Sequence, residues 1–325
     1  MKKNRGIKAV GLLSGGLDST LAVKLMIDQG VDVRVLNFVT PFCTCTRKGC
    51  RHEAIRVAEL FGVPVKIISG GKAYIEMIKN PKHGYGKNMN PCIDCRIFMF
   101  RKAKKYMKDI GASFIFTGEV LDQRPMSQYK KAMKTIEKES ELENLLLRPL
   151  SAKLLDSTIP EEEHWIDREK LLSIQGRRRL PQIELADKLG VKDYPCPAGG
   201  CRLTDPHFAK RIKESFEHGE DTIKDIQLLK YGRHFRLKSG AKVIVGRNEE
   251  ENKIIEKFQD ENYILIEVIG AGSPIVLLKK IKGTSDTKKA ASLCVRYSDA
   301  DKDEDLNIRI KDFNTPEELI KFSSL

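Results

Sequence analysis

The hexapeptide Ser-Gly-Gly-Leu-Asp-Ser at 14–19 constrains this chain more than any other feature of its sequence. It stands between a short apolar run at 8–13, which predicts a buried strand, and the helical periodicity of 20–29. Two consecutive glycines let the backbone turn sharply and bring its N–H groups close to an anion. A helix that begins directly after such a turn points the positive end of its dipole at the same place. The segment therefore predicts a phosphate-binding loop at the end of the first strand of an α/β sheet.

The loop contains one carboxylate among its hydrogen-bond donors. Asp18 cannot donate to a phosphate, so we expect it to act as a catalytic residue that orients the loop or helps to hold Mg²⁺. No Gly-Lys-Ser or Gly-Lys-Thr follows the glycines, which excludes a Walker loop. The alternative is an ordinary Gly-Gly turn between a strand and a helix. The expected cofactor-binding positions of the loop are Ser14, Gly15, Gly16, Ser19 and Thr20.

The segment 14–19 resembles the PP-loop of the N-type ATP pyrophosphatases, which cleave ATP between its α and β phosphates. That superfamily has a doubly wound fold of the adenine nucleotide α-hydrolase-like type. The resemblance implies an α/β protein with a doubly wound parallel sheet, and ATP and Mg²⁺ as cofactors. It does not distinguish the members of the superfamily from one another.

Strand and helix signals alternate over the first part of the chain. Apolar strand candidates at 32–39, 63–68 and 113–117 are separated by helical stretches at 52–61 and 96–108. This alternation predicts a parallel sheet with crossover helices, whose ligands lie beyond the carboxyl ends of the strands.

The alternation fades after about residue 150. We expect a PP-loop domain over 1–218, of which 156–218 is a cysteine-containing extension, and a smaller α+β domain over 219–325. No run approaches the roughly 20 apolar residues that span a bilayer, and the apolar stretch behind the basic N-terminus is too short for a secretory signal. We therefore expect a cytoplasmic protein with no membrane partner.

The eight cysteines are grouped rather than scattered. In a reducing compartment such groups indicate metal ligation or sulfur chemistry rather than disulfides. Cys294 stands apart in an apolar run and is expected to be a buried small hydrophobe. The groups are Cys43, Cys45 and Cys50; Cys92 and Cys95; and Cys196 and Cys201.

Two resemblances bear on the second and third groups. Asn-Pro-Cys at 90–92 is similar to the first active-site cysteine motif of tRNA 2-thiouridine synthases. The pair Cys92-x-x-Cys95 with a distant third cysteine resembles tRNA thiolation enzymes in which three cysteines hold a [4Fe-4S] cluster and leave one iron open to carry sulfur. Cys201 is preferred to Cys196 as the third ligand, because the two glycines before it would leave its sulfur accessible.

Two other interpretations of these cysteines stay open. Cys92 and Cys201 would also suit a catalytic nucleophile and a resolving cysteine that work through a persulfide. A purely structural zinc site is the third interpretation. The first group, with His52 two residues after it, has the donors of a four-ligand Zn²⁺ site, and structural zinc is our expectation for Cys43, Cys45 and Cys50.

Further site residues are expected at the later strand ends. Gly118, in a Thr-Gly turn similar to those that approach the nucleotide in the superfamily, and Arg124, which could neutralise phosphate charge, follow the strand at 113–117. Lys153 ends an Arg-Pro-Leu-x-x-Lys segment that resembles one in several PP-loop tRNA enzymes, which implies a phosphate contact. The basic face of the helix at 96–108 and the run 177–179 suit an RNA backbone, although each would also serve as a solvated surface.

The formal net charge of +13 favours a polyanionic partner. Residues 225–310 resemble the RNA-binding module of the NFACT proteins through Val-Gly-Arg-Asn at 245–248 and the Gly-rich turn at 270–275. The segment lacks the Asp-x-x-Phe-His stretch that precedes that turn in the family, so its contacts do not all carry over. A small domain that only braces the catalytic one is the alternative.

Together these features predict ATP-dependent thiolation of a tRNA uridine. The expected partners are tRNA and a sulfur donor, which would be a cysteine desulfurase, a sulfur carrier or sulfide. Two alternatives remain: a PP-loop ligase or amidotransferase on a small molecule, similar to deazaguanine nitrile synthase, and a non-catalytic RNA-binding protein. The first is disfavoured because that family has a four-cysteine zinc site near its C-terminus, where this chain has only Cys294.

Overall fold

A computed structural model describes residues 6–43, 49–192, 194, 200–280, 286–301, 305–313 and 315–322. The chain divides into two compact units, Met1–Ala209 and Lys210–Leu325. The division falls inside the helix α8 (Pro206–Glu217), whereas the sequence suggested a boundary after residue 218, just beyond the end of that helix. Within the described residues no helix is long and apolar enough to cross a membrane.

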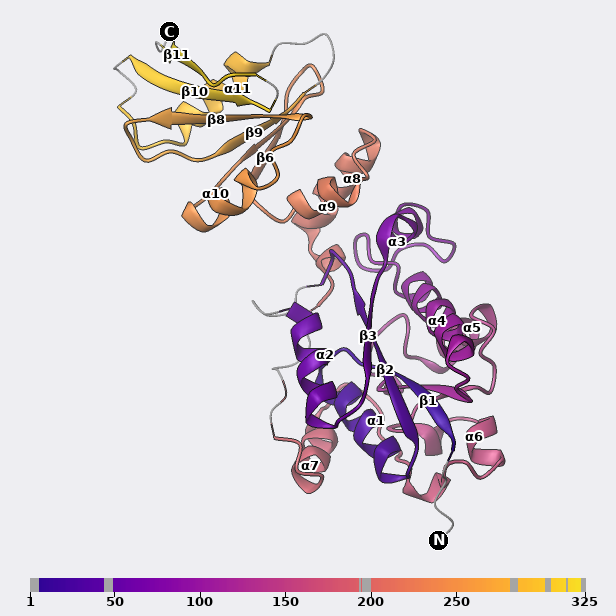
Figure 1. Cartoon of the computed structure of the whole chain (residues 1–325). Coiled ribbons are helices and arrows are strands. Elements are labelled where there is room, and N and C mark those ends of the chain that lie inside the picture. The colour runs from indigo at the N-terminus through magenta and orange to yellow at the C-terminus, as the bar shows by residue number, and fades with distance from the viewer. Residues whose placement is uncertain are drawn as a thin grey trace. The chain divides into compact units, whose positions relative to one another are not determined.

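The first unit is built on a five-stranded parallel sheet with the order β3-β2-β1-β4-β5 (Figure 1). Because β1 lies between β2 and β4, the strand order reverses direction at β1, and in such sheets ligands bind at the carboxyl ends of the strands on either side of that point. The predicted doubly wound parallel sheet is confirmed. The strands are β1 (Lys8–Leu12), β2 (Asp32–Val39), β3 (Val65–Ser69), β4 (Phe114–Thr117) and β5 (Leu146–Leu147).

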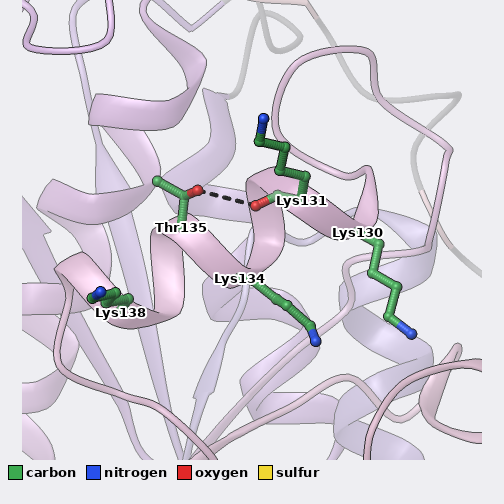
Figure 2. A pocket seen from close by; sticks show the side chains of 5 residues that line it. All are labelled: Lys130, Lys131, Lys134, Thr135 and Lys138. Carbon is green, nitrogen blue, oxygen red and sulfur yellow. Dashed lines mark hydrogen bonds between the residues drawn. The ribbon is translucent and has the colours of Figure 1, made fainter.

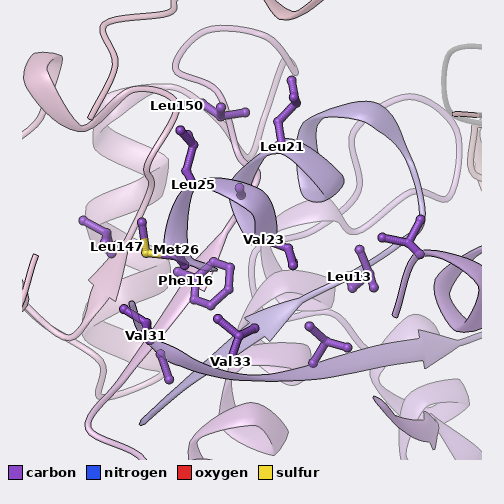
Figure 3. Packing of buried hydrophobic residues seen from close by; sticks show 14 of the residues in the cluster. Leu13, Leu21, Val23, Leu25, Met26, Val31, Val33, Phe116, Leu147 and Leu150 are labelled. Atoms are coloured by element: carbon purple, nitrogen blue, oxygen red, sulfur yellow. The ribbon is translucent and has the colours of Figure 1, made fainter. Parts of the chain in front are cut away.

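Helices cover both faces of this sheet, with α1, α2 and α7 on one side and α4 and α5 on the other (Figure 1). The strands alternate accordingly: Ala9 and Val33 pack toward α1, whereas Val10 and Leu36 pack toward α4. Figure 3 shows the apolar face of α1 packed over the sheet. The helices are α1 (Leu17–Asp28), α2 (Gly49–Leu60), α3 (Gly71–Lys79), α4 (Cys92–Asp109), α5 (Lys130–Glu139), α6 (Ile159–Glu162) and α7 (Leu180–Lys188), with 3-10 turns at Ala152–Leu154, Arg168–Lys170 and Arg202–Thr204.

The segment that follows β5 is part of the first unit rather than an appendage. The ring of Trp165 stacks on Phe114 of β4 with 6.4 Å between centroids. Leu171, Ala186 and Val191 are buried in the same core as α1. The first part of the expected extension at 156–218 is therefore packed into the core of the first unit.

The second unit is an antiparallel sheet with the order β11-β10-β8-β9-β7-β6 and helices on both faces, as the expected α+β domain requires. Val243 and Val245 pack with α11, while Ile244 packs with α9 and α10. Cys294 of α11 is fully buried in this core, which confirms its predicted role. The elements are β6 (Arg233–Arg236), β7 (Lys242–Val245), β8 (Tyr263–Ile269), β9 (Val276–Lys279), β10 (Leu306–Asp312), β11 (Glu318–Phe322), α9 (Ile223–Leu228), α10 (Glu249–Glu256) and α11 (Thr287–Arg296).

Candidate functional site

The loop between β1 and α1 closes on itself through its hydroxyls. Ser14 N–H donates to Ser19 Oγ (3.3 Å), and the two serine hydroxyls lie 3.1 Å apart. Ser19 Oγ and Thr20 Oγ1 both donate to the carbonyl oxygen of Gly16, at 2.9 and 3.0 Å. These bonds hold a compact turn at the N-terminus of α1, which is the arrangement that binds an anion through backbone N–H groups.

Two glycines are required by the packing around this loop. Gly15 has φ +79°, and a Cβ there would lie 2.6 Å from Cβ of Glu53 and 2.8 Å from its carbonyl carbon. A Cβ at Gly118 would lie 2.5 Å from the backbone carbonyl of Asp18 and from the backbone nitrogen of Ser19. Gly118 therefore lets the end of β4 pack against the first turn of α1, and thereby supports the loop from behind.

Asp18 lies half-buried in the first turn of α1 among polar groups from two other segments of the chain. Burial raises the pKa of its carboxyl, whereas the guanidiniums of Arg179 and Arg124 act against that rise. The amides of Gln123 and Gln182 also face this carboxyl. Within the described residues, however, Asp18 Oδ1 and Gln123 Nε2 have no hydrogen-bond partner. The carboxylate is thus positioned toward a polar space that a ligand or cation would fill.

Arg124 connects the loop to the cysteines. Its side chain is exposed, although the protein around the guanidinium lowers its pKa by desolvation, and the neighbouring Arg96 lowers it further. The charges of Cys92 and Asp18 act in the opposite direction, so the guanidinium lies within electrostatic reach of both. The predicted phosphate-neutralising residue therefore senses the charges of both the loop carboxylate and the first cysteine of α4.

Three cysteines meet beside Arg124 although they are distant in sequence. Cys92 and Cys95 occupy the first turn of α4, and each thiol raises the pKa of Cys201 through its charge. Cys201 is held at this edge of the sheet because its segment pairs with the chain that follows β2, where Arg202 N–H donates to the carbonyl oxygen of Phe42 at 2.8 Å. All three thiols are half-buried.

A tyrosine that the sequence analysis missed lies among these thiols. The hydroxyl of Tyr74 is 3.0 Å from Sγ of Cys95, and burial together with the charges of Cys95 and Cys201 raises the pKa of Tyr74 well above its ordinary value. Burial raises the pKa of Cys95 and raises that of Cys201 to about 12. Without a cation to neutralise them, Cys95 and Cys201 are therefore held as thiols rather than thiolates at neutral pH.

Of the remaining cysteines that the sequence predicts as metal ligands, the structure describes only some. No three His, Cys, Asp or Glu side chains among the described residues are spaced to hold a metal ion. The backbone of Cys43 forms a β-bridge with that of Cys201, whose thiol is free. Cys43 is disulfide-bonded, and because zinc binds thiolates it could serve the expected zinc site only in its reduced form. Cys45, Cys196 and the side chain of Cys50 lie outside the described residues, so the zinc site remains a prediction.

The ammonium of Lys153 is engaged away from the loop. It donates to the carbonyl oxygen of Glu169 at 2.9 Å and to its carboxylate at 3.0 Å. A phosphate contact by Lys153 would therefore require this pair to open.

A buried ion network behind the cysteines was also missed. Glu119 is 2% exposed and receives Arg148 Nε at 3.1 Å and Arg96 Nε at 3.2 Å, while Arg148 also pairs with Glu137 of α5. The pKa of Cys95 is raised by burial, and the charge of Arg96 offsets part of that rise. The sequence signal was the Glu that directly follows Gly118, together with the Arg of the Arg-Pro-Leu segment. Glu119 and Arg148 therefore hold Arg96 in place, and we do not assign them a phosphate contact.

An open hollow of about 460 Å³ lies on α5 and is lined by Lys130, Lys131, Lys134, Thr135 and Lys138. Figure 2 shows that these lysine side chains point in different directions. Lys130 and Lys134 pair with Asp156. The lysines do not converge on one anion, so this hollow is a basic surface and not the centre of the site.

The parallel sheet, the Gly-rich turn before α1 and the polar groups around Asp18 define a PP-loop nucleotide-binding domain. Residues 5–156 match the family described as thiamine biosynthesis protein (ThiI), and residues 232–325 match the NFACT protein RNA binding domain. Each match covers less than half of the chain.

Individual relatives agree with this assignment. The tRNA-specific 2-thiouridylase MnmA of Leptospira interrogans is 31% identical over 129 residues, which cover 34% of this chain and 33% of that protein. A probable tRNA sulfurtransferase of Thermococcus kodakarensis is 30% identical over 179 residues, which cover 48% of this chain and 44% of that protein. The chain thus spans between a third and a half of the length of these relatives.

Solved structures with similar folds include a 4-thiouridine synthetase–RNA complex with bound ATP, at 22% identity and a TM-score of 0.42, covering 69% of this chain and 52% of that one. The U34-tRNA thiolase NcsA of Methanococcus maripaludis with its [4Fe-4S] cluster has 17% identity and a TM-score of 0.34, covering 70% of this chain and 74% of that one.

Proposed function

We propose that this chain catalyses ATP-dependent thiolation of a uridine in tRNA. The observation that carries the proposal is that Cys92, Cys95 and Cys201 lie within electrostatic reach of one another, and that Arg124 lies within reach of both Cys92 and Asp18 of the PP-loop. This proximity supports a site in which sulfur transfer and nucleotide chemistry take place together. An enzyme that only hydrolysed ATP would have no use for this juxtaposition.

The first step activates the base. The carbonyl oxygen of the uridine attacks the α-phosphorus of ATP, the bond to the β-phosphate oxygen breaks, and pyrophosphate leaves. A carbonyl oxygen is otherwise a poor leaving group, so adenylation is needed before sulfur can replace it. The N–H groups of the loop and the Arg124 guanidinium would stabilise the charge that develops on the phosphates. Asp18, whose Oδ1 has no partner among the described residues, suits a role in holding Mg²⁺.

In the second step sulfide, as HS⁻, adds to the activated carbon, the C–O bond breaks so that AMP leaves with the oxygen, and loss of the S–H proton leaves a C=S bond. Three thiols are the donors that iron–sulfur ligation uses, so Cys92, Cys95 and Cys201 are the residues that would hold a cluster. As the structure describes them, their side chains are not spaced to hold a metal ion, so binding a cluster would require the three thiols to move closer together. When bound, the cluster would supply an iron with an open position able to carry sulfide. The raised pKa values of Cys95 and Cys201 agree with thiols that ionise when a cation binds to them.

Transfer RNA is the proposed carrier of the base. The relatives named above are a tRNA thiouridylase and a probable tRNA sulfurtransferase. The segment 232–325 matches an RNA-binding domain. The charge of +13 would strengthen binding of the nucleic acid backbone through counterion release. A dry pocket would have to receive the target base out of the stack.

The test measures AMP formation from ATP with and without unmodified tRNA, and thionucleosides by mass spectrometry, on protein purified without oxygen. We expect AMP to require tRNA, and Cys92→Ala to abolish thiolation while AMP formation persists. Cys294→Ala is the matched control, because that cysteine lies in the core of the second unit. Thiolation at the normal level by Cys92→Ala would overturn the proposal, and AMP formation that does not depend on tRNA would favour a small-molecule substrate.

Iron, sulfide and zinc analysis of the same preparation tests the cluster, and fully active protein without iron would exclude it.

A further inference from the structure

The segment after β5 reaches the loop at the end of β4. Leu121 and Gln175 form a parallel β-bridge, and Gly176 N–H donates to the carbonyl oxygen of Leu121 at 2.8 Å. Gln175 Nε2 donates to the Asp122 carboxylate at 2.6 Å. These bonds place the arginine run 177–179 directly beside the loop that carries Arg124.

The three arginines of this run have different environments. Arg177 and Arg178 are exposed, whereas Arg179 is half-buried and precedes the first residue of α7. Its guanidinium is the strongest charge acting on Asp18, and within the described residues it forms no ion pair. The surface role expected for the whole run therefore suits its first two members, while the third faces the PP-loop.

One turn into α7, Gln182 gives independent evidence that this space receives a ligand. Its side chain is fully buried and lies close enough to the Asp18 carboxyl to lower that group's pKa, yet neither of its amide atoms reaches hydrogen-bond geometry with a described residue. It faces the carboxyl of Asp18, whose Oδ1 is likewise without a partner. Buried polar groups in folded proteins nearly always have partners, so a cluster of unpartnered ones at the start of two packed helices indicates a bound polar molecule.

We propose that Arg179 and Gln182 form the second wall of the polyphosphate site, in which Arg179 binds the pyrophosphate part of ATP and Gln182 positions Asp18. The PP-loop contributes neutral N–H donors, and Arg124 is the cation nearest to it from the β4 side. A triphosphate carries several negative charges, and a second guanidinium from α7 would neutralise the group that leaves as pyrophosphate. Arg179 and Gln182 lie outside the matched segment 5–156, so the family match does not assign them.

This inference rests on the ATP cleavage of the proposed function but not on thiolation, and it is tested without tRNA. Isothermal titration of the full chain with magnesium pyrophosphate, and separately with AMP, compares Arg179→Ala with Arg178→Ala, which removes the same charge from the exposed neighbour. We expect Arg179→Ala to weaken pyrophosphate binding about 10- to 100-fold, and Arg178→Ala less than about 2-fold, with AMP binding unchanged in both. Arg179→Lys, which keeps the charge but loses the planar fork, should fall between them. Equal pyrophosphate affinity for the Arg179 and Arg178 variants would overturn the inference.

Gln182→Leu separates a positioning role from a structural one. A buried glutamine without hydrogen-bond partners destabilises the unliganded fold, so its replacement by leucine should leave the thermal midpoint of the unliganded protein unchanged or raise it. Pyrophosphate should bind several-fold more weakly to this variant. A lower midpoint with unchanged pyrophosphate affinity would show that the glutamine is structural and would overturn its assigned role. If the unmodified chain binds pyrophosphate but does not thiolate tRNA, that result would count against the proposed function and not against this inference.

Discussion

Replacement of Gly15 by alanine tests whether the PP-loop depends on the backbone conformation and close packing seen here. The glycine has φ +79°, a conformation that costs an L-residue roughly 1–2 kcal/mol. The new Cβ would also lie 2.6 Å from Cβ of Glu53 and 2.9 Å from the backbone nitrogen of Ala54. Both neighbours belong to the body of α2, so the helix must shift, and overpacking of this kind costs about 1–3 kcal/mol.

These two contributions predict that Gly15→Ala lowers the free energy of unfolding of the first unit by about 2–5 kcal/mol. The chain has one tryptophan, Trp165, and it packs in the core of that unit against Phe114. Urea unfolding followed by tryptophan fluorescence therefore reports on the first unit. Nucleotide affinity, measured by titration of the same protein, should fall as well.

The matched control is the neighbouring glycine. Gly16 has φ −81°, and a Cβ there would meet only Ser14 Oγ at 3.5 Å, which is an ordinary contact. Gly16→Ala should therefore change the free energy of unfolding by less than about 1 kcal/mol. If Gly15→Ala unfolds at the same urea concentration as Gly16→Ala, the steric reasoning is wrong.

Three further outcomes are expected. Gly118→Ala, whose Cβ would meet the backbone of Asp18 at 2.5 Å, should weaken ATP binding more than about 10-fold in a titration, and unchanged affinity would contradict the packing argument. Burial would raise the pKa of Glu220, but Arg236 and Lys242 lower it from 4.5 to about 2, so the stability it contributes is present above pH 4.5 and is lost as the pH falls toward 2. In an acid titration followed by circular dichroism, the free energy of unfolding should accordingly fall by about 3 kcal/mol across that window. Glu220→Gln should reduce this dependence of the unfolding free energy on pH. With a pKa of about 12, Cys201 should react with iodoacetamide at pH 8 roughly 100-fold more slowly in the folded apoprotein than in denatured chain; equal rates by peptide mass spectrometry would refute its burial.

The helices that sequence reasoning did not anticipate show what a local pattern can miss. The expected helices at 52–61 and 96–108 correspond to α2 and α4, but α3 and α5 were not anticipated. In α5 the apolar positions Ala132, Met133 and Ile136 are only three among many lysines and glutamates, so the buried stripe is narrow. Such a helix is held by tertiary packing rather than by a strong pattern of its own.

The sequence by itself determined the phosphate loop, the parallel α/β class and the pairing of Cys92 with Cys95, because each of these depends on neighbours within a few residues. The sequence favoured Cys201 as the third cysteine only through the two glycines before it, whereas tertiary structure brings it to this sheet edge through a β-bridge to residue 43. Tertiary structure also decided that Arg179, and not Arg177 or Arg178, faces Asp18. Consecutive side chains at the start of a helix point in different directions. The packing of the helix decides which of them points toward the PP-loop, and no local sequence pattern encodes that packing.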